Sequence, residues 1–95
     1  MRVISIKKLR EFWTNHPQAE TSLRAWHTIV KASDWKHFPD LKQSFPSADL
    51  VGRRTVFDIL GNRFRLIARV NYQTKLVFVL HVLTHAEYGQ GKWTK

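Results

Sequence analysis

The segment Thr84-His85-Ala86-Glu87-Tyr88 places an imidazole, a carboxylate and a phenol directly after the last apolar run of the chain. An imidazole changes its charge near neutral pH, and positioned phenols and carboxylates transfer protons, so these groups could serve general acid–base catalysis. If the segment is helical, His85 and Tyr88 fall on one side at i and i+3; if it is extended, His85 and Glu87 share a side. Both arrangements give His85 a polar partner. The alternative is a loop histidine that covers the end of a sheet.

Three arginines, Arg63, Arg65 and Arg69, fall on one face of a strand expected upstream of this segment, Arg63–Tyr72. Residues two apart on a strand lie roughly 6.5–7 Å apart, close to the phosphate repeat of an extended nucleic-acid strand. A guanidinium group holds a phosphate with two hydrogen bonds and stacks on bases. The pattern therefore favours nucleic-acid binding, and the alternative is a solvated outer face whose charges discourage aggregation.

The basic charge of the chain is concentrated in its second half. The formal net charge is +9, and the residues from Leu50 onward contribute +6 of it, with Arg53 and Arg54 adding to the three arginines of the strand. A basic surface attracts polyanions and speeds encounter with them. A solubilising surface, or a patch for an acidic protein partner, would show the same excess of positive charge.

The residues that commonly bind metals are few and scattered. The chain has no cysteine, only His81 and His85 among its five histidines lie four residues apart, and its seven acidic residues do not cluster. Thiolate zinc sites are excluded, and two-metal nuclease chemistry is disfavoured. We expect no metal and no cofactor, and interpret His81 as a core or sheet-face residue rather than a ligand. No run approaches the roughly 18 apolar residues of a membrane span, so a cytoplasmic protein is expected.

The hydrophobic period predicts one α+β domain over residues 1–95, with 89–95 a short polar tail anchored by Trp93. The apolar spacing changes from a helical to a strand period near Phe45. The helical part is Lys7–Asn15, a stretch that begins at Pro17, and a short segment from Pro39. The extended part is Arg2–Ile6, Thr55–Leu60, Arg63–Tyr72 and Lys75–Leu83, with tight turns at Gly61-Asn62 and Gln73-Thr74. We expect two layers, an N-terminal strand and helices packed on an antiparallel meander whose arginine face is left open.

The order of these motifs resembles the HigB family of bacterial toxins, which belongs to the RelE-like toxins. The resemblance runs from Met1 to about Tyr88. Its most specific parts are Gly61-Asn62-Arg63-Phe64-Arg65-Leu66 and Thr84-His85-Ala86-Glu87-Tyr88, and it is also carried by Leu9-Arg10-Glu11-Phe12-Trp13, His16-Pro17, and Phe45-Pro46-Ser47-Ala48-Asp49.

The resemblance implies an mRNA endonuclease that acts largely on ribosome-bound message. It implies metal-free cleavage, in which the ribose 2′-OH attacks the adjacent phosphorus and leaves a 2′,3′-cyclic phosphate and a 5′-OH. It also implies a small antiparallel sheet with helices on one face. The partner would be a HigA-type antitoxin with a helix-turn-helix domain, and DNA would be contacted only through that complex.

The resemblance also implies roles for single residues. His85 would be the general base or acid, and Tyr88 the other proton-handling group or a platform for stacking. Arg65 and Arg69 would stabilise the phosphate, all the more because Leu80 and Leu83 stand where the family often has a basic residue and a glycine. Glu87 would orient His85 or pair with an arginine, and further RNA contacts would come from Arg63, Arg53, Arg54 and Lys36. The alternatives are a non-catalytic RNA-binding module and, with less support, an adaptor for an acidic protein.

Overall fold

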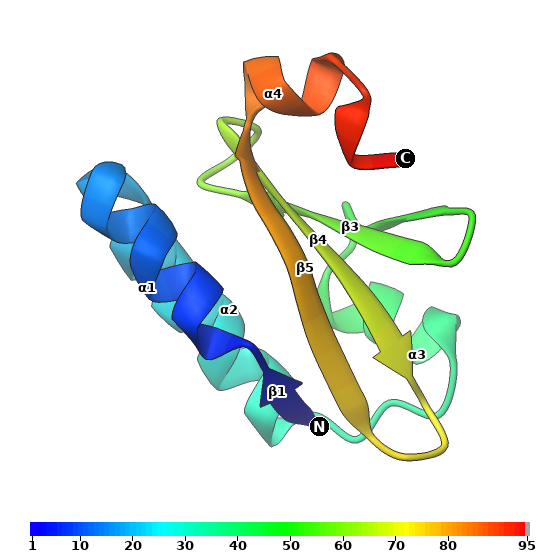
Figure 1. Cartoon of the computed structure of the whole chain (residues 1–95). Helices are drawn as coiled ribbons and strands as arrows, with labels where there is room; N and C mark the ends of the chain where they lie inside the picture. Colours follow the sequence, from blue (N-terminus) through cyan, green and yellow to red (C-terminus); the bar gives the residue numbers. More distant parts are fainter. Residues whose placement is uncertain (95) are drawn as a thin grey trace.

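A computed structural model describes residues 1–94 (Figure 1). The elements are β1 (Arg2–Ile4), α1 (Ile6–Asn15), η1 (Pro17–Ala19), α2 (Glu20–Ala32), α3 (Phe38–Ser44), β2 (Asp49–Val51), β3 (Arg54–Ile59), β4 (Phe64–Asn71), β5 (Leu76–Thr84), α4 (His85–Gly89) and η2 (Lys92–Thr94). The predicted α+β class is confirmed, and the predicted helices and strands lie within one or two residues of their expected bounds, although the stretch from Pro17 opens with a 3₁₀ turn. No helix of the described chain is long and apolar enough to cross a membrane.

The sheet has five strands in the order β1-β5-β4-β3-β2. The predicted antiparallel meander is confirmed, since β4 pairs antiparallel with both β3 and β5. Two features were not predicted. The first is that β1 pairs with β5 in parallel, with Val3 opposite Val77. The second is the edge strand β2, whose three exposed residues show no alternation of apolar and polar side chains.

Both hairpins of the meander have longer connections than the predicted two-residue turns. The register pairs Ile59 with Phe64 and Asn71 with Leu76, so each connection has four residues between the paired ends. The first connection turns through positive φ at Leu60 and Gly61, 52° and 65°. The side chain of Asn71 organises the second connection, because its Oδ1 accepts hydrogen bonds from two backbone N–H groups of the turn.

The core lies between the sheet and the helices. The predicted alternation along β4 is confirmed, because its apolar face packs into the main core with the apolar stripe of α2. That face consists of Phe64, Leu66, Ala68 and Val70, and the stripe consists of Leu23, Trp26 and Val30. Figure 1 shows α3 behind β4, and α2 behind α1 at the side of the meander. The opposite side of the sheet, called the outer face below, faces away from these helices.

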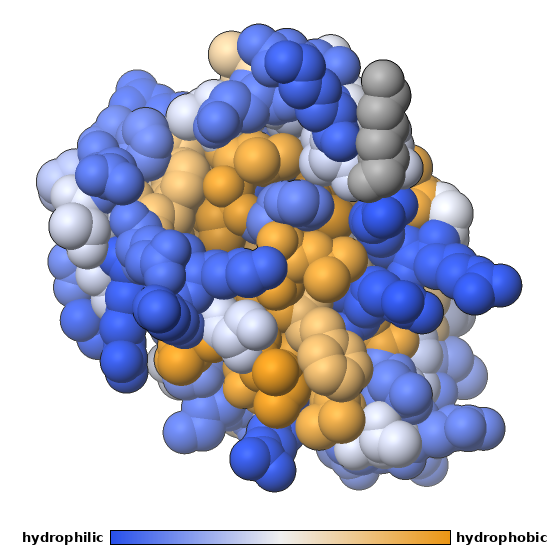
Figure 2. Space-filling model, viewed as in Figure 1, coloured by the Kyte–Doolittle hydropathy of each residue, from blue (hydrophilic) through white to orange (hydrophobic). Residues whose placement is uncertain are grey.

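The outer face is less basic than the sequence predicted. The register places Leu83 opposite Arg65, His81 opposite Ile67 and Phe78 opposite Arg69. A band of apolar surface therefore follows β5, with polar surface on both sides of it (Figure 2).

The polar tail covers one end of the outer face. Trp93 is 7% exposed and packs on Val56 and Ile67, with Leu83 and Tyr88 beside it. Its anchoring role, expected from the sequence, is confirmed for the residues up to Thr94. Because the indole buries Ile67, the tail helps to fix the position of β4 relative to the C-terminal end of β5.

Candidate active site

The helix α4 begins at His85 because of a capping box. The side chain of Thr84 accepts a hydrogen bond from the backbone N–H of Glu87 at 3.2 Å, and the Glu87 carboxylate accepts one from the backbone N–H of Thr84 at 2.9 Å. This reciprocal pair satisfies two free N–H groups of the first turn. The segment is therefore helical, the first of the two arrangements considered above, and His85 and Tyr88 lie one turn apart on the same side.

The capping box also corrects the role expected for Glu87. Its carboxylate is bound to the backbone of Thr84, and within residues 1–94 it forms no ion pair with an arginine and no hydrogen bond with His85. The acidic group at the first turn instead stabilises the N-terminal end of α4. Glu87 thus helps to shape the helix that carries the other two groups.

Two further contacts hold α4 in place. The backbone N–H of His85 donates to the carbonyl oxygen of Arg63 at 2.9 Å. The indole Nε1 of Trp93 donates to the carbonyl oxygen of Tyr88 at 3.0 Å, and the two rings stack with centroids 5.1 Å apart and an interplanar angle of 13°. The half-buried phenol ring of Tyr88 is therefore fixed from behind by the tail, while the His85 side chain is exposed.

Arg65 approaches Tyr88 from β4. Its guanidinium carbon lies 5.2 Å from the centroid of the Tyr88 ring, within the range of a cation–π contact. Its Nε forms an ion pair with Asp58 at 3.2 Å, and its Nη1 donates to the carbonyl oxygens of Asn62 and Phe64 at 2.8 and 3.3 Å. The side chain is 12% exposed. Within residues 1–94 its Nη2 has no partner, so this nitrogen is available to an anion.

Sequence reasoning missed Asp58 and Trp93, the two residues that support Arg65 and Tyr88. Asp58 stands directly opposite Arg65 in the β3–β4 register, which is known only once the strands are paired. A signal was present, because Asp58 is the one acid between Leu50 and Thr84. Trp93 was recognised as an anchor of the tail but not as a support for Tyr88.

Arg69 lies away from this group. It is four residues beyond Arg65 on β4, which is about 13 Å along a strand, and it pairs with Phe78 instead of with the end of β5. Arg54, at the start of β3, lies at the same end of the meander, because the next residue, Thr55, pairs with Ala68. Arg53 precedes it in the connection from β2. The structure therefore does not place Arg69 on the same phosphate as Arg65.

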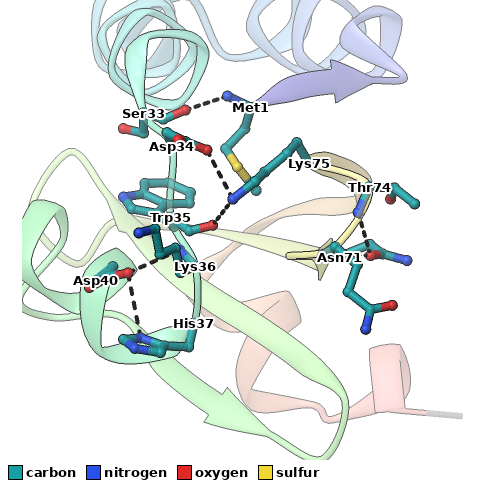
Figure 3. Close-up of polar contacts among 11 residues, drawn as sticks. Met1, Ser33, Asp34, Trp35, Lys36, His37, Asp40, Asn71, Thr74 and Lys75 are labelled. Atoms are coloured by element: carbon teal, nitrogen blue, oxygen red, sulfur yellow. Dashed lines mark hydrogen bonds and ion pairs between the residues drawn. The ribbon is translucent and has the colours of Figure 1, made fainter.

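Of the other expected RNA contacts, Arg63 lies beside α4 and Lys36 lies far from it. Arg63 is exposed and adjoins α4 through its carbonyl oxygen. Lys36 lies between α2 and α3, next to Trp35, whose carbonyl oxygen accepts a hydrogen bond from Lys75 at 2.9 Å (Figure 3). Since Lys75 belongs to the connection between β4 and β5, Lys36 is at the far end of the sheet from His85.

His81 is exposed on the outer face, so the sheet-face interpretation holds. Partial burial lowers the pKa of the His81 imidazole below its ordinary value, and the nearby positive charges of Lys8 and Arg54 lower it further. The imidazole of His81 therefore binds a proton more weakly than a free histidine does. Among residues 1–94, no group of three or more histidine and acidic side chains is arranged to hold a metal ion.

Comparisons with known proteins agree with the motif pattern. Residues 19–91 match the family model HigB_toxin, the RelE-like toxic component of a toxin–antitoxin system. The mRNA interferase HigB of Escherichia coli O6:H1 is 31% identical over 93 residues, 95% of this chain and 90% of that protein. The mRNA interferase toxin HigB of Escherichia coli K12 is 31% identical over 91 residues, 93% of this chain and 88% of that protein. The mRNA interferase HigB of Shigella flexneri gives the same values.

Proposed function

Because the chain belongs to the HigB family, the RelE-like toxic component of toxin–antitoxin systems, we propose that it cuts message where α4 presents His85 and Tyr88 beside Arg65. The chain is the toxin of such a system and an mRNA endoribonuclease, an activity that inhibits translation. The observation that carries the position of the site is the contact between the Arg65 guanidinium and the Tyr88 ring at 5.2 Å.

The reaction assigned to this site is attack of the ribose 2′-OH on the adjacent phosphorus. The new P–O bond closes a 2′,3′-cyclic phosphate, and the bond to the 5′-oxygen breaks. One group must take the proton of the 2′-OH, and another must give a proton to the departing 5′-oxygen. His85 and Tyr88 are the pair available on one side of α4. The guanidinium of Arg65 stabilises the extra negative charge of the five-coordinate phosphorane through Nη2.

This assignment uses no metal and no cofactor. Proton transfer comes from an imidazole and a phenol, and charge stabilisation comes from a guanidinium held by Asp58 at 3.2 Å. Since Arg65 is held in place by Asp58 and by two backbone carbonyls, little reorganisation is needed when charge develops on the phosphate.

Neighbouring nucleotides follow the outer face from this site. Arg63 is next to α4 and meets a phosphate at one side of the cut, while Arg69, Arg54 and Arg53 lie at the other end of the meander and bind phosphates further along the strand. Lys36 lies outside this path. Binding of this kind weakens as salt rises, because each neutralised phosphate releases counterions.

The setting of the reaction is also part of the proposal. The net charge of +9 suits encounter with ribosomal RNA, so we place the cleavage on ribosome-bound message in the cytoplasm. The antitoxin partner that the family implies would be of the HigA type with a helix-turn-helix domain. DNA would then be contacted only through the complex with that antitoxin.

The test maps the ends of cleaved message. Purified wild-type protein and the variants His85→Ala and Tyr88→Phe are incubated with free RNA in excess EDTA, and with programmed ribosomes in magnesium. We expect 2′,3′-cyclic phosphate and 5′-OH ends, and a loss of about 10²–10⁴-fold in rate for a variant that lacks a proton-transfer group. His37→Ala, which removes an exposed histidine far from α4, is the matched control and should cut at the wild-type rate.

Two outcomes would contradict this scheme. Cleavage that stops in EDTA on free RNA, or products with 3′-OH ends, would replace the metal-free reaction. Binding of RNA without any cleavage, on or off the ribosome, would favour the second candidate, a non-catalytic module that acts through its basic residues. The observation that supports this second candidate is the exposure of Arg69 and Arg53.

A further inference from the structure

A cavity of about 630 Å³ opens beside the far end of the β4–β5 hairpin, away from α4. Its size falls within the range of small-molecule sites. Arg69 and Asn71 of β4, Gln73 of the connection, and Phe78 and Leu80 of β5 contribute to its wall. None of His85, Tyr88 and Arg65 lines it, so it is separate from the proposed cleavage site.

The apolar part of the wall has an exposed aromatic ring. Phe78 is 37% exposed, although it lies in a nine-residue strand that otherwise buries Val77 and Val79. The register shift between Ile67 and Ala68 leaves Leu80 as an extra residue of β5 beside it. This bulge brings Leu80 to the cavity. An exposed ring of this kind offers a face on which a base can stack.

The polar part of the wall has unused hydrogen-bond donors. The Oδ1 of Asn71 accepts from the backbone N–H groups of Gln73 and Thr74 at 3.1 and 3.0 Å, which leaves its amide NH₂ available to donate (Figure 3). Within residues 1–94 the guanidinium of Arg69 forms no ion pair, and no carboxylate lines the cavity. A ring, an amide and a guanidinium together are the groups with which proteins hold an unstacked base and its phosphate.

The distance from the cleavage site fits a strand of RNA on the outer face. Arg65 and Arg69 are four residues apart on β4, or about 13 Å. Two strand residues span about one phosphate repeat of an extended nucleic-acid strand, so Arg69 stands about two nucleotides from Arg65. A segment of a protein partner suits the cavity less well, because stable protein interfaces involve about 20–30 residues on each side.

We infer that this cavity binds one base of the message, about two nucleotides from the scissile bond, with the base stacked on Phe78, its edge meeting Asn71 and its phosphate on Arg69. The inference rests on the proposed function for the position of the cut, but it concerns binding. It gives the enzyme a contact at which the identity of a base beyond the scissile pair affects affinity.

The experiment is a scan of short RNA oligonucleotides, each labelled with a fluorophore and made uncleavable with 2′-O-methyl riboses. One abasic residue is moved through the sequence, and affinity is measured by fluorescence anisotropy. For wild-type protein, one abasic position should weaken binding about tenfold, and end mapping should place it two nucleotides from the cut. In Phe78→Leu the intact oligonucleotide should bind about tenfold more weakly, with no further loss at that abasic position.

Two further variants control for folding and for exposure. Phe78→Trp keeps an aromatic face and should restore the abasic effect that Phe78→Leu abolishes. Ile29→Ala removes an exposed apolar side chain of α2, 42% exposed, and should leave the whole scan unchanged. Far-UV circular dichroism confirms that each variant is folded at the assay temperature.

The inference fails if no abasic position weakens binding, or if Phe78→Leu weakens the intact and abasic oligonucleotides equally. It also fails if Phe78→Leu leaves RNA affinity unchanged and instead weakens binding to the purified antitoxin, which would assign the cavity to a protein. Because the scan needs no cleavage, a wild-type protein that cuts no RNA would contradict the proposed function while the scan still decides on the base site.

Discussion

At the scale of single residues, Tyr88 has two possible roles that the structure makes separable. Its ring is held between the indole of Trp93 and the guanidinium of Arg65, and its hydroxyl is the only group of the side chain that transfers a proton. Tyr88→Phe keeps both ring contacts and removes the hydroxyl. Tyr88→Ala removes all three.

We predict that Tyr88→Phe lowers the cleavage rate about 10²-fold or more with RNA affinity unchanged, because proton transfer is lost while the platform is kept. Single-turnover cleavage and anisotropy measure the two quantities. A Phe variant as active as wild type, beside an inactive Ala variant, would instead make Tyr88 a platform. Proton transfer would then rest on His85, whose replacement by alanine should abolish cleavage.

In the proposed site, Asp58 acts on the phosphate only through Arg65. The carboxylate is 30% exposed and the arginine side chain 12% exposed, so the ion pair at 3.2 Å is partly shielded from solvent. Loss of the charge in Asp58→Asn should leave the guanidinium held by two backbone carbonyls alone, with more freedom of position. It is therefore a positioning residue.

We predict that Asp58→Asn lowers the single-turnover rate about tenfold while the RNA dissociation constant changes less than threefold, because misplacement affects the transition state more than the ground state. The free energy of unfolding should fall by about 1 kcal/mol, as for a partly exposed ion pair. Asp58→Glu should recover part of the rate. Equal losses of rate and affinity in Asp58→Asn would show a general electrostatic effect.

At the scale of elements, the spacing of apolar residues predicted the helices and strands that bury one face. The apolar stripe of α2 and the alternation of apolar residues in β4 could be recognised in the sequence because each element buries one face. Three features depend on which distant segments meet, and the periodicity of apolar residues does not predict such contacts. They are the parallel pairing of Val3 with Val77, the edge strand β2, and the packing of Trp93 on Ile67. The same limit applies to the site. His85, Tyr88 and Arg65 were identified by their chemistry, whereas Asp58 was found through strand register.

The tail is an element that supports both the site and the fold. Trp93→Phe keeps the stack on Tyr88 but loses the hydrogen bond from Nε1 to the Tyr88 carbonyl oxygen, and it should cost about 1 kcal/mol. Trp93→Ala also loses the packing on Val56 and Ile67 and should cost about 3–5 kcal/mol. Urea unfolding followed by far-UV circular dichroism measures both losses.

The tail variants also test the link between α4 and catalysis. If the stack positions Tyr88, then at a temperature where both variants are folded, Trp93→Ala should cut RNA much more slowly than Trp93→Phe. An alanine variant that is folded and fully active would show that the tail serves stability alone. Ile29→Ala, which removes an exposed apolar side chain of α2, is the control for loss of an apolar side chain.

At the scale of the whole molecule, the excess of positive charge contributes to lowering the pKa values of two histidines, His27 and His81. Burial lowers the pKa of His27 below its ordinary value of 6.5, and the charges of Lys31 and Arg10 lower it further. For His81 the causes are burial and then the charges of Lys8 and Arg54. Each imidazole thus binds a proton more weakly in the folded chain than in the unfolded chain.

This difference fixes the direction of the pH dependence of stability. Well above pH 6.5 both imidazoles are neutral in both states and contribute nothing to the pH dependence. As pH falls through 6.5 the unfolded chain takes up protons first, so the free energy of unfolding decreases, and the loss is complete only below the folded pKa values. Asp34 acts in a lower window, because Lys75 holds the pKa of its carboxyl below 3.8.

We predict that the wild-type protein loses stability steadily from pH 7.5 to pH 5, and that the double variant His27→Gln, His81→Gln loses much less over the same range. Urea unfolding curves at half-unit steps measure both, and a constant m-value shows that the denatured state has not changed. If the double variant loses as much stability as the wild type between pH 6.5 and 5, the basic surface destabilises the fold through groups other than these two imidazoles.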